Sequence, residues 1–417
     1  MSTIARSIVI VGAGQAGVQA ASALRAEGYD GAIHLLGNEP CLPYQRPPLS
    51  KSYLSGNIAD EELHLETAQW FDEQRIERSV DTHVDSIERR LKRVKLSSGR
   101  MLGYDHLILA TGARNRPLPA LSEPIQGVIS LRTVADAAAL TSKLRGSRRV
   151  VVIGAGFLGL EVASVAIAQG CDVHVVESVD RVMQRAISVE MSQACLRHHR
   201  TAGLKFSFNA RVDAFCAKDG HVSAVKFADG SQLDADLVLV AIGVVPNSEL
   251  GLACGLDIYN GFIVDEQLRT SDPSIFAIGD CAAFPYAFDG GDRLRLESVQ
   301  NAVDQACYVA RRIVGTADAP RYDQVPVFWS DQGGMRLQMA GVARRLDASV
   351  LRGDPSTGAF SVFRYRHDRL TAVESFNRPA DHMAARRMLQ RRISPSRAQA
   401  ADITFDLKSL LAAAVTT

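Results

Sequence analysis

Two copies of one glycine motif constrain the fold of this chain more than any other feature. The first copy is GAGQAG, with Gly12, Gly14 and Gly17, and the second is GAGFLG, with Gly154, Gly156 and Gly159. Each copy follows an apolar run and opens a helix-like stretch, and the patterns at 6–36 and 148–177 predict strand, helix and strand. In such a turn the first glycine makes the bend, the second lets backbone approach a pyrophosphate, and the third lets the helix pack on the strand. The repeat therefore predicts two dinucleotide-binding units of Rossmann type.

A strand that ends in glycine closes each unit. The run YDHLILATGA (104–113) places Thr111 and Gly112 at a strand end, and ADLVLVAIGVVP (235–246) places Gly243 at the equivalent point. A glycine there lets backbone approach a ligand. A further strand, SIFAIGDCA (274–282), ends in Gly279 and Asp280 and must return to one of the two units. A buried acid is costly unless it accepts hydrogen bonds, so Asp280 is expected to have hydrogen-bond donors as partners, and a helix N-cap would supply them.

The end of the chain has a different pattern. Segments 321–343 and 358–377 alternate apolar and polar residues with turn glycines, which indicates antiparallel strands, and a basic helix is expected at 379–393. The predicted fold class is α/β, with two Rossmann-like domains and a C-terminal α+β domain. The first domain takes residues 1–114 and 243–320, the second takes 115–242, and the third takes 321–417.

Composition excludes several classes of function. The formal net charge of +1 gives no sign of a nucleic-acid-binding protein. The seven cysteines are too scattered for a disulfide framework or a metal cluster, so a cytoplasmic protein without a metal site is expected. No apolar run is long enough to span a membrane. Cys281 is expected to be buried and inert, and the neighbours His198 and His199 are expected to face solvent on a helix.

The residues that follow the second strand of each unit bear on the choice of nucleotide. Glu177 stands where the fingerprint has an acid for the ribose, and its charge repels a 2′-phosphate, which favours NADH over NADPH. Arg181 and Arg185 follow closely and leave that preference open. The first unit has Asn38 and Glu39 at this point, and either could reach a ribose. Since no cysteine pair or cluster is available to hold electrons, a bound flavin is the simplest carrier, with FAD in the first unit and NADH in the second.

Further segments extend this pattern through nearly the whole chain. They are IVIVGAGQAG (8–17), LPYQRPPLSK (42–51), LILATGARNRPLP (107–119), VVIGAGFLGLEVA (151–163), IGVVPNSEL (242–250), TSDPSIFAIGDCA (270–282), RLESVQNAVDQA (295–306) and VFWSDQ (327–332). With them the chain resembles the FAD-dependent, NADH-using ferredoxin reductases of bacterial oxygenase systems. PYQRPPLSK, ESVQNA and FWSDQ are specific to that resemblance, whereas the glycine motifs are shared with many disulfide reductases. The resemblance implies a glutathione-reductase-like fold.

The resemblance also implies an activity and roles for individual residues. A hydride passes from NADH to bound FAD, and single electrons then pass to a [2Fe-2S] ferredoxin that supplies a cytochrome P450 or a ring-hydroxylating oxygenase. Phe157 resembles an aromatic gate over the flavin, and Glu161 resembles the acid that meets the nicotinamide amide. The positions implied for FAD contact are Ala16, Asn38, Glu39, Arg46, Lys51, Val84, Arg132, Asp280, Val299 and Trp329. A plain core position is the alternative for Phe157 and Trp329.

Lys51 and Glu161 form the predicted catalytic centre together with Phe157. A cation beside the flavin N5–C4 edge favours the reduced, negatively charged ring, and this suits Lys51. Such a lysine is costly in a dry site without a counter-ion, so we predict that it pairs with Glu161. The alternative is that both are solvated surface charges.

The expected partner is a small acidic ferredoxin, which needs a basic docking face. The predicted docking patch contains Arg311, Arg312, Arg386, Arg387, Arg391 and Arg392. A merely solvated helix face is the alternative. Two other functions also remain open: a rubredoxin reductase, and a flavoprotein like apoptosis-inducing factor, which acts by binding and signalling.

Overall fold

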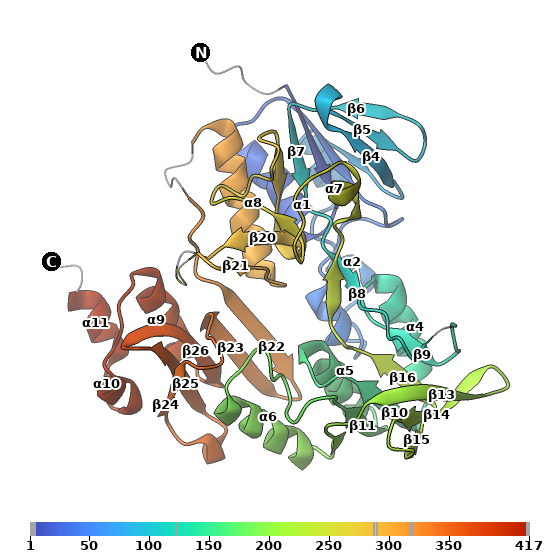
Figure 1. The fold of residues 1–417 in the computed structure, drawn as a ribbon, viewed down its shortest axis with the longest axis vertical. Coiled ribbons are helices and arrows are strands. Elements are labelled where there is room, and N and C mark those ends of the chain that lie inside the picture. Colours follow the sequence, from blue (N-terminus) through green and yellow to red (C-terminus); the bar gives the residue numbers. More distant parts are fainter. Residues whose placement is uncertain (1–5, 122, 287, 289–290, 317–320, 414–417) are drawn as a thin grey trace. The chain divides into compact units, whose positions relative to one another are not determined.

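The computed structural model describes residues 6–121, 123–286, 288, 291–316 and 321–413, which form two compact units (Figure 1). The first unit takes Met1–Gln45, Asp60–Arg114 and Val244–Gln324, and the second takes Arg46–Ala59, Asn115–Gly243 and Val325–Thr417. Each unit holds one of the two glycine motifs beside a parallel sheet. Over the described ranges, no helix combines the length and the apolar character needed to cross a bilayer.

The centre of the first unit is a five-stranded parallel sheet in the order β19-β7-β1-β2-β3. Its strands are β1 (Ser7–Val11), β2 (Ala32–Leu36), β3 (Ile76–Ser79), β7 (His106–Leu109) and β19 (Ile275–Ala277). Ile8, Ile10 and Leu107 are fully buried, as expected for apolar strands that are covered on both faces. The strand predicted at 274–282 therefore returns to this sheet, where Ile275 lies opposite Leu107.

Helices α1 (Gln15–Ala26) and α8 (Val299–Val314) of the first unit pack side by side (Figure 1). Ala20 and Ala21 of α1 are fully buried, and such small side chains allow close helix packing. Gly28 follows the C-cap of α1 and has φ +86°, a conformation that commonly ends a helix. The other elements of this unit are α2 (Asp60–Leu63), α3 (Ala68–Glu73), α7 (Glu249–Ala253), β4 (Val84–Glu88), β5 (Arg93–Leu96), β6 (Met101–Gly103), β17 (Val244–Pro246), β18 (Phe262–Ile263), β20 (Ala282–Pro285), β21 (Arg293–Leu294) and the 3₁₀ turns η2 (Arg89–Leu91) and η3 (Gly279–Cys281). Strand β17 pairs with β8 (Ala113–Asn115).

The second unit contains a second parallel sheet, in the order β12-β11-β10-β16-β9. Its strands are β9 (Val128–Ser130), β10 (Arg149–Ile153), β11 (Asp172–Val176), β12 (Lys205–Ser207) and β16 (Leu237–Val240). Its helices are α4 (Val134–Leu144), α5 (Phe157–Ala168) and α6 (Val189–Thr201), and the turn η1 (Pro47–Ser50) packs on α4 and α5. A small antiparallel sheet buries Val225 against Val151 and Val238, and its strands are β13 (Val212–Lys218), β14 (His221–Phe227) and β15 (Gln232–Asp234).

The second unit also contains the C-terminal antiparallel sheet, in the order β22-β23-β26-β25-β24. Its strands are β22 (Val327–Gln332), β23 (Met335–Gly341), β24 (Ala348–Arg352), β25 (Phe360–Arg366) and β26 (Arg369–Phe376). Helix α9 (Pro379–Gln390) packs on β23 and β26, and α10 (Arg397–Ala401) and α11 (Leu407–Ala413) follow. The predicted strands and basic helix are present, and β24, α10 and α11 are additional.

The contacts within the chain group the C-terminal sheet and residues 46–59 with the second glycine motif. The α/β fold class with an added C-terminal α+β part agrees with the prediction. The three-domain division at 114, 242 and 320 remains our proposal, because packing alone gives two units.

Candidate active site

The turn at Gly12–Gly17 leaves an open space only where a phosphate is expected. A Cβ atom on Gly12, which has φ +112°, would overlap the carbonyl oxygen of Ala110, and one on Gly17 would overlap the carbonyl oxygen of Gly12. A Cβ atom on Gly14 would meet nothing within 4 Å. Two glycines are therefore required by backbone packing, and the third borders an open space.

The turn at Gly154–Gly159 repeats this geometry. A Cβ atom on Gly154, with φ +106°, would overlap the carbonyl oxygen of Ala241, and one on Gly159 would overlap that of Gly154. Gly156 again has nothing within 4 Å of a built Cβ. In both turns, therefore, the first and third glycines are required by backbone packing and the middle glycine borders an open space.

Both open glycines are helix N-caps. Gly14 begins α1 and Gly156 begins α5, neither supplies a capping side chain, and neither helix has an acid in its first turn. The N–H groups and the positive end of the helix dipole therefore face the open space of each turn. Both turns fit the pyrophosphate of a dinucleotide, and they are called the first and second cradles below.

Glu177, directly after β11, braces the second cradle. One carboxylate oxygen accepts the N–H of Ala155 at 2.8 Å, and the other accepts the N–H of Ser178 at 2.7 Å. Arg181 turns into its own loop, where its guanidinium donates to the carbonyls of Gln184 at 2.8 Å and Ile187 at 2.9 Å. Burial lowers the pKa of Arg181. Its donors are engaged with backbone, whereas Arg185 is exposed and its Nη2 lies 3.5 Å from a Cβ atom built on Gly243, so Arg185 still leaves the preference for NADH open.

The corresponding residues of the first unit differ in exposure. Asn38 is exposed, whereas Glu39 is partly buried and accepts the hydroxyl of Tyr44 at 2.5 Å. The choice between Asn38 and Glu39 as ribose ligand stays a prediction.

The Gly-Asp turn of the first unit lies against the first cradle. Gly279 has φ +73°, and a Cβ atom on it would lie 3.0 Å from that of Ala16 in α1. Its N–H donates to Gln305 Oε1 at 2.8 Å. The adjacent Asp280 is partly exposed, and it follows a glycine that packs against the first turn of α1.

The glycines at the two strand ends both have a positive φ. Gly112 has φ +65° and Gly243 has φ +94°. Thr111, beside Gly112, exchanges hydrogen bonds with Asn247. A positive φ favours glycine at both strand ends, and the approach of a ligand to them stays a prediction.

Lys51 and Glu161 are paired within the second unit, which confirms that predicted contact. Lys51 Nζ lies 2.7 Å from Glu161 Oε2, and the Glu161 side chain is 7% exposed. Two serines complete the carboxylate: Ser50 donates to Oε2 and Ser330 donates to Oε1, both at 2.5 Å. A buried carboxylate held on both oxygens is stable only with such partners.

Phe157, the first residue of α5, contacts an aromatic residue of β22 with its ring tilted by 41°. Its ring centroid lies 4.5 Å from that of Phe328. Trp329 is the next residue and is partly buried. The structure thus places Phe157 and Glu161, one turn apart on α5, against the same strand.

The remaining predicted FAD positions divide between the units. Arg46 donates to the carbonyl of Arg132 at 2.7 Å in the second unit. In the first unit Val299 begins α8, and Val84 is 3% exposed at the start of β4, so its side chain is in the core. Their contacts with FAD stay predictions.

The predicted docking arginines form two groups. Arg311 and Arg312 lie in the last turn of α8, where Arg312 donates to Gln267 at 3.0 Å. At the end of α9, Arg386 is partly buried while Arg387, Arg391 and Arg392 are exposed. Each group lies in a different unit.

One prediction is wrong: His199 does not face solvent. It is 1% exposed, and its Nε2 lies 2.8 Å from Gln332 Oε1. His198 is partly buried, with Nε2 2.9 Å from the carbonyl oxygen of Gly333. The helix pattern alone could not show that the β22–β23 hairpin covers this end of α6.

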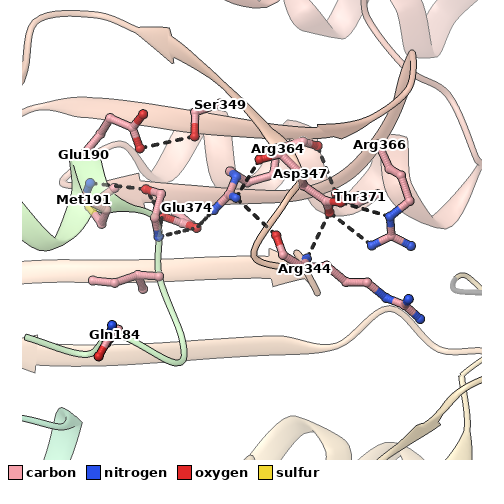
Figure 2. Close-up of polar contacts among 12 residues, drawn as sticks. Gln184, Glu190, Met191, Arg344, Asp347, Ser349, Arg364, Arg366, Thr371 and Glu374 are labelled. Atoms are coloured by element: carbon pink, nitrogen blue, oxygen red, sulfur yellow. Dashed lines mark hydrogen bonds and ion pairs between the residues drawn. The ribbon is translucent and has the colours of Figure 1, made fainter. Parts of the chain in front are cut away.

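The other end of α6 is held by a buried acid of the C-terminal sheet (Figure 2). Glu374 of β26 accepts the N–H of Ser188 at 2.9 Å and its hydroxyl at 2.6 Å, and Ser188 is the N-cap of α6. Arg364 Nη1 lies 3.3 Å from Glu374 Oε1. Burial raises the pKa of Glu374, and the bonds from Ser188 oppose that rise.

The cysteines and acids suggest no other redox or metal centre in the described part of the chain. All seven cysteines are free, and Cys281 is fully buried, which confirms the predicted burial, and that burial raises the pKa of its thiol. Within the described residues, no group of three or more His, Cys, Asp or Glu side chains could hold a metal ion. The candidate chemistry therefore lies at the cradles and the Lys51–Glu161 pair.

Comparison with known proteins agrees with this geometry. The family model described as pyridine nucleotide-disulphide oxidoreductase matches residues 6–306, and that described as reductase C-terminal matches residues 327–411. Rhodocoxin reductase from Rhodococcus erythropolis is 48% identical over 97% of this chain and 94% of that protein. The solved ferredoxin reductase for the CYP199A2 system from Rhodopseudomonas palustris is 44% identical, with a TM-score of 0.94 over 97% of this chain and 99% of the other. A chain of the solved covalent putidaredoxin reductase–putidaredoxin complex is 38% identical, with a TM-score of 0.96 over 100% of both chains.

These matches confirm the family that the motifs predicted, and membership implies the use of FAD and a pyridine nucleotide. With two glycine cradles, a C-terminal reductase domain and relatives this close along nearly its full length, the chain belongs to the ferredoxin reductases of the pyridine nucleotide-disulphide oxidoreductase family.

Proposed function

We propose that this ferredoxin reductase binds FAD at the first cradle and NADH at the second, and that it reduces a [2Fe-2S] ferredoxin supplying a cytochrome P450 or ring-hydroxylating oxygenase. The observation that carries the proposal is the pair of cradles, each with an open space at its middle glycine. Bound FAD would accept a hydride from NADH and release its electrons singly.

The residues near each cradle support this assignment of the nucleotides. Asp280 stands beside the first cradle, where its carboxylate suits the hydroxyls of a ribityl chain. Glu177 stands beside the second, where its charge suits a ribose with a free 2′-hydroxyl and repels a 2′-phosphate. Arg181 is engaged with backbone carbonyls and supplies no ready counter-charge for a 2′-phosphate, which leaves the exposed Arg185 as a nearby arginine that could offset Glu177.

The Lys51–Glu161 pair would act on both cofactors. Glu161 would accept a hydrogen bond from the nicotinamide amide and so orient the ring. Lys51 would offer positive charge to the flavin as it is reduced. Phe157, held by Phe328, would cover the flavin until a nicotinamide displaces it.

The proposed partner follows from charge and from the relatives. The solved relative in covalent complex with putidaredoxin supports a small ferredoxin as acceptor. The exposed Arg387, Arg391 and Arg392 offer a basic surface to an acidic protein, and Arg311 and Arg312 offer a second group of cations.

An anaerobic titration of the purified protein tests the cofactors. Bleaching of the visible flavin absorbance by stoichiometric NADH, with NADPH far slower, is expected. A protein without bound flavin, or a flavin that NADH leaves oxidised, would contradict the proposal. Adding a [2Fe-2S] ferredoxin and, separately, a rubredoxin to the reduced protein then identifies the acceptor: faster electron transfer to the ferredoxin is expected, and transfer to rubredoxin alone would replace the proposed partner.

A further inference from the structure

Strand β22 presents alternate residues to helices α5 and α6. The Phe328 ring contacts that of Phe157, Ser330 donates to Glu161, and Gln332 contacts His199. Side chains of a strand alternate between its faces, so these even-numbered residues share one face. Trp329 is therefore not the only residue of the motif FWSDQ with a bearing on the site. Its serine and glutamine contact the nucleotide-binding part of the second unit.

The polar members of this face form a continuous buried chain. Ser330 is fully buried, and Gln332 and His199 are each 1% exposed. Gln332 Nε2 donates to Ser330 Oγ at 2.9 Å and lies 3.9 Å from Met183 Sδ, while its Oε1 faces His199 Nε2 at 2.8 Å. The Ser330 hydroxyl then donates to Glu161 Oε1.

The charge of Glu161 gives this chain one direction. A carboxylate has only acceptor atoms, so Ser330 must donate its single hydroxyl hydrogen to Glu161. Its oxygen then accepts a hydrogen bond from the Gln332 amide. The amide oxygen then faces His199, which must carry its proton on Nε2. Burial lowers the pKa of His199 to about 4, so the ring is neutral near pH 7 and holds one proton only.

We propose that Ser330, Gln332 and His199 are positioning residues for Glu161, linked as a hydrogen-bond chain whose direction is set by the Glu161 carboxylate. The inference rests on the proposed function in one respect, which is that Glu161 orients the nicotinamide. Lys51 and Ser50 hold one carboxylate oxygen and the chain holds the other, so the carboxylate plane is fixed. When the plane of the Glu161 carboxylate is fixed, its remaining lone pairs point in defined directions and can orient the nicotinamide amide.

The variant Glu161→Gln tests the direction of the chain. Lys51 and Ser50 are both donors, so the new amide turns its oxygen to them and its NH₂ to Ser330. Ser330 must then donate to Gln332, whose amide turns over and places its NH₂ against His199 Nε2. His199 is therefore expected to change from the Nε2–H to the Nδ1–H tautomer, although it does not contact residue 161.

Nitrogen-15 NMR of histidine-labelled full-length protein, as purified and without pyridine nucleotide, measures this tautomer. The variant His199→Gln identifies the His199 signals among those of the ten histidines. The control Glu190→Gln makes the same substitution on α6 itself, at a side chain that accepts from Ser349, and should leave the tautomer unchanged. An Nδ1–H tautomer in the unaltered protein, or one tautomer shared by the protein and Glu161→Gln, would overturn the proposal.

The variant Ser330→Ala interrupts the chain and supplies a second test. In the Ser330→Ala background, adding Glu161→Gln should no longer change the His199 tautomer, and a persistent change would contradict a path through Ser330. The rate constant of flavin reduction at saturating NADH should fall about 10-fold, as expected for a lost bond to a charged group, while the NADH dissociation constant changes less than about 3-fold.

The matched control for Ser330 is Ser164→Ala. Ser164 is also buried, and its hydroxyl donates to the carbonyl of Leu160 within α5. Its removal should leave both the rate constant and the tautomer unchanged, and an equal loss of rate in the two variants would indicate a general packing effect. The tautomer is measured without NADH, so a failed chain and a failed proposed function are distinguishable: a flavin bleached by NADH with an unresponsive His199 disproves the chain alone.

Discussion

The Lys51 ammonium lies 2.7 Å from the Glu161 carboxylate, yet the lysine side chain is 23% exposed and the glutamate only 7%. Loss of the partner should therefore be more costly for Glu161 than for Lys51. The lysine can be hydrated without its partner, whereas the glutamate would be left charged in a dry environment.

Removing the lysine should for this reason destabilise the protein more than removing a surface lysine. Lys51→Met is expected to lower the free energy of unfolding by about 1–3 kcal/mol, below the full cost for a buried pair because Lys51 is partly exposed. The control is Lys205→Met, since Lys205 also lies 2.7 Å from a carboxylate, that of Asp172, with both side chains 57% exposed. Its cost should be under about 1 kcal/mol by denaturant unfolding, and equal costs would show that burial of Glu161 does not matter.

The two cradle glycines of α5 should separate binding from stability. Gly156→Ala places a methyl group where no protein atom lies within 4 Å, at φ −80°, which alanine tolerates. The midpoint of thermal unfolding should hardly change, while NADH binding weakens by at least about 10-fold because the methyl group enters the phosphate site. Gly159→Ala should instead unfold the protein at lower temperature, since its Cβ would overlap Gly154 backbone. Normal NADH affinity in Gly156→Ala would show that the second cradle is not part of the NADH-binding site.

Replacing Glu177 should weaken the preference for NADH. In Glu177→Gln the negative charge is lost while a carbonyl oxygen remains for the N–H of Ala155. The ratio of NADH to NADPH rate constants in anaerobic flavin reduction should fall about 10-fold, which corresponds to about 1.4 kcal/mol. Glu190→Gln, elsewhere in the same unit, should leave the ratio unchanged. An unchanged ratio of the NADH and NADPH rate constants in Glu177→Gln would mean that another residue excludes the 2′-phosphate.

The buried His199 should make the folded state sensitive to acid. Its pKa is about 4 in the folded protein against about 6.5 when unfolded, so the unfolded chain binds the extra proton between these values. Stability is complete above pH about 6.5 and falls as the pH drops toward about 4, by about 3 kcal/mol at most from this residue.

His199→Gln should flatten that part of the pH profile of unfolding free energy. His382, whose pKa burial also lowers to about 4, retains its own contribution, so the dependence should shrink and not vanish. The exposed His221 provides the control, because His221→Gln should not alter the slope. An unchanged slope in His199→Gln would contradict the lowered pKa.

The sequence predicted those features that local pattern determines. The glycine turns and the strands beside them follow from backbone sterics and the apolar pattern, and each is present. The Lys51–Glu161 pair was predicted because the family resemblance placed both residues at the cofactor site and a buried charge needs a counter-charge. Residues that meet only through tertiary packing were not predictable in this way.

Ser330 and His199 illustrate that second group. The alternation in FWSDQ places Ser330 on the same face as Phe328, which was a usable signal, but it does not reveal which helix that face covers. His199 follows the helical period of α6 among polar neighbours, and only the β22–β23 hairpin makes its position dry. When a residue is buried by a segment that is distant in the sequence, the residues around it carry no pattern that predicts the burial.

Helix α6 is held at both ends by the C-terminal sheet, through Ser188 to Glu374 and through His199 to Gln332. This arrangement limits how the chain can be recombined with its relatives. A C-terminal region grafted from another reductase would have to supply an acid for the cap of α6 and an amide for its last turn, or the graft would leave a buried serine and histidine without partners. The two ends of α6 are therefore the positions to match first when chimeric reductases are built to accept new electron-transfer partners.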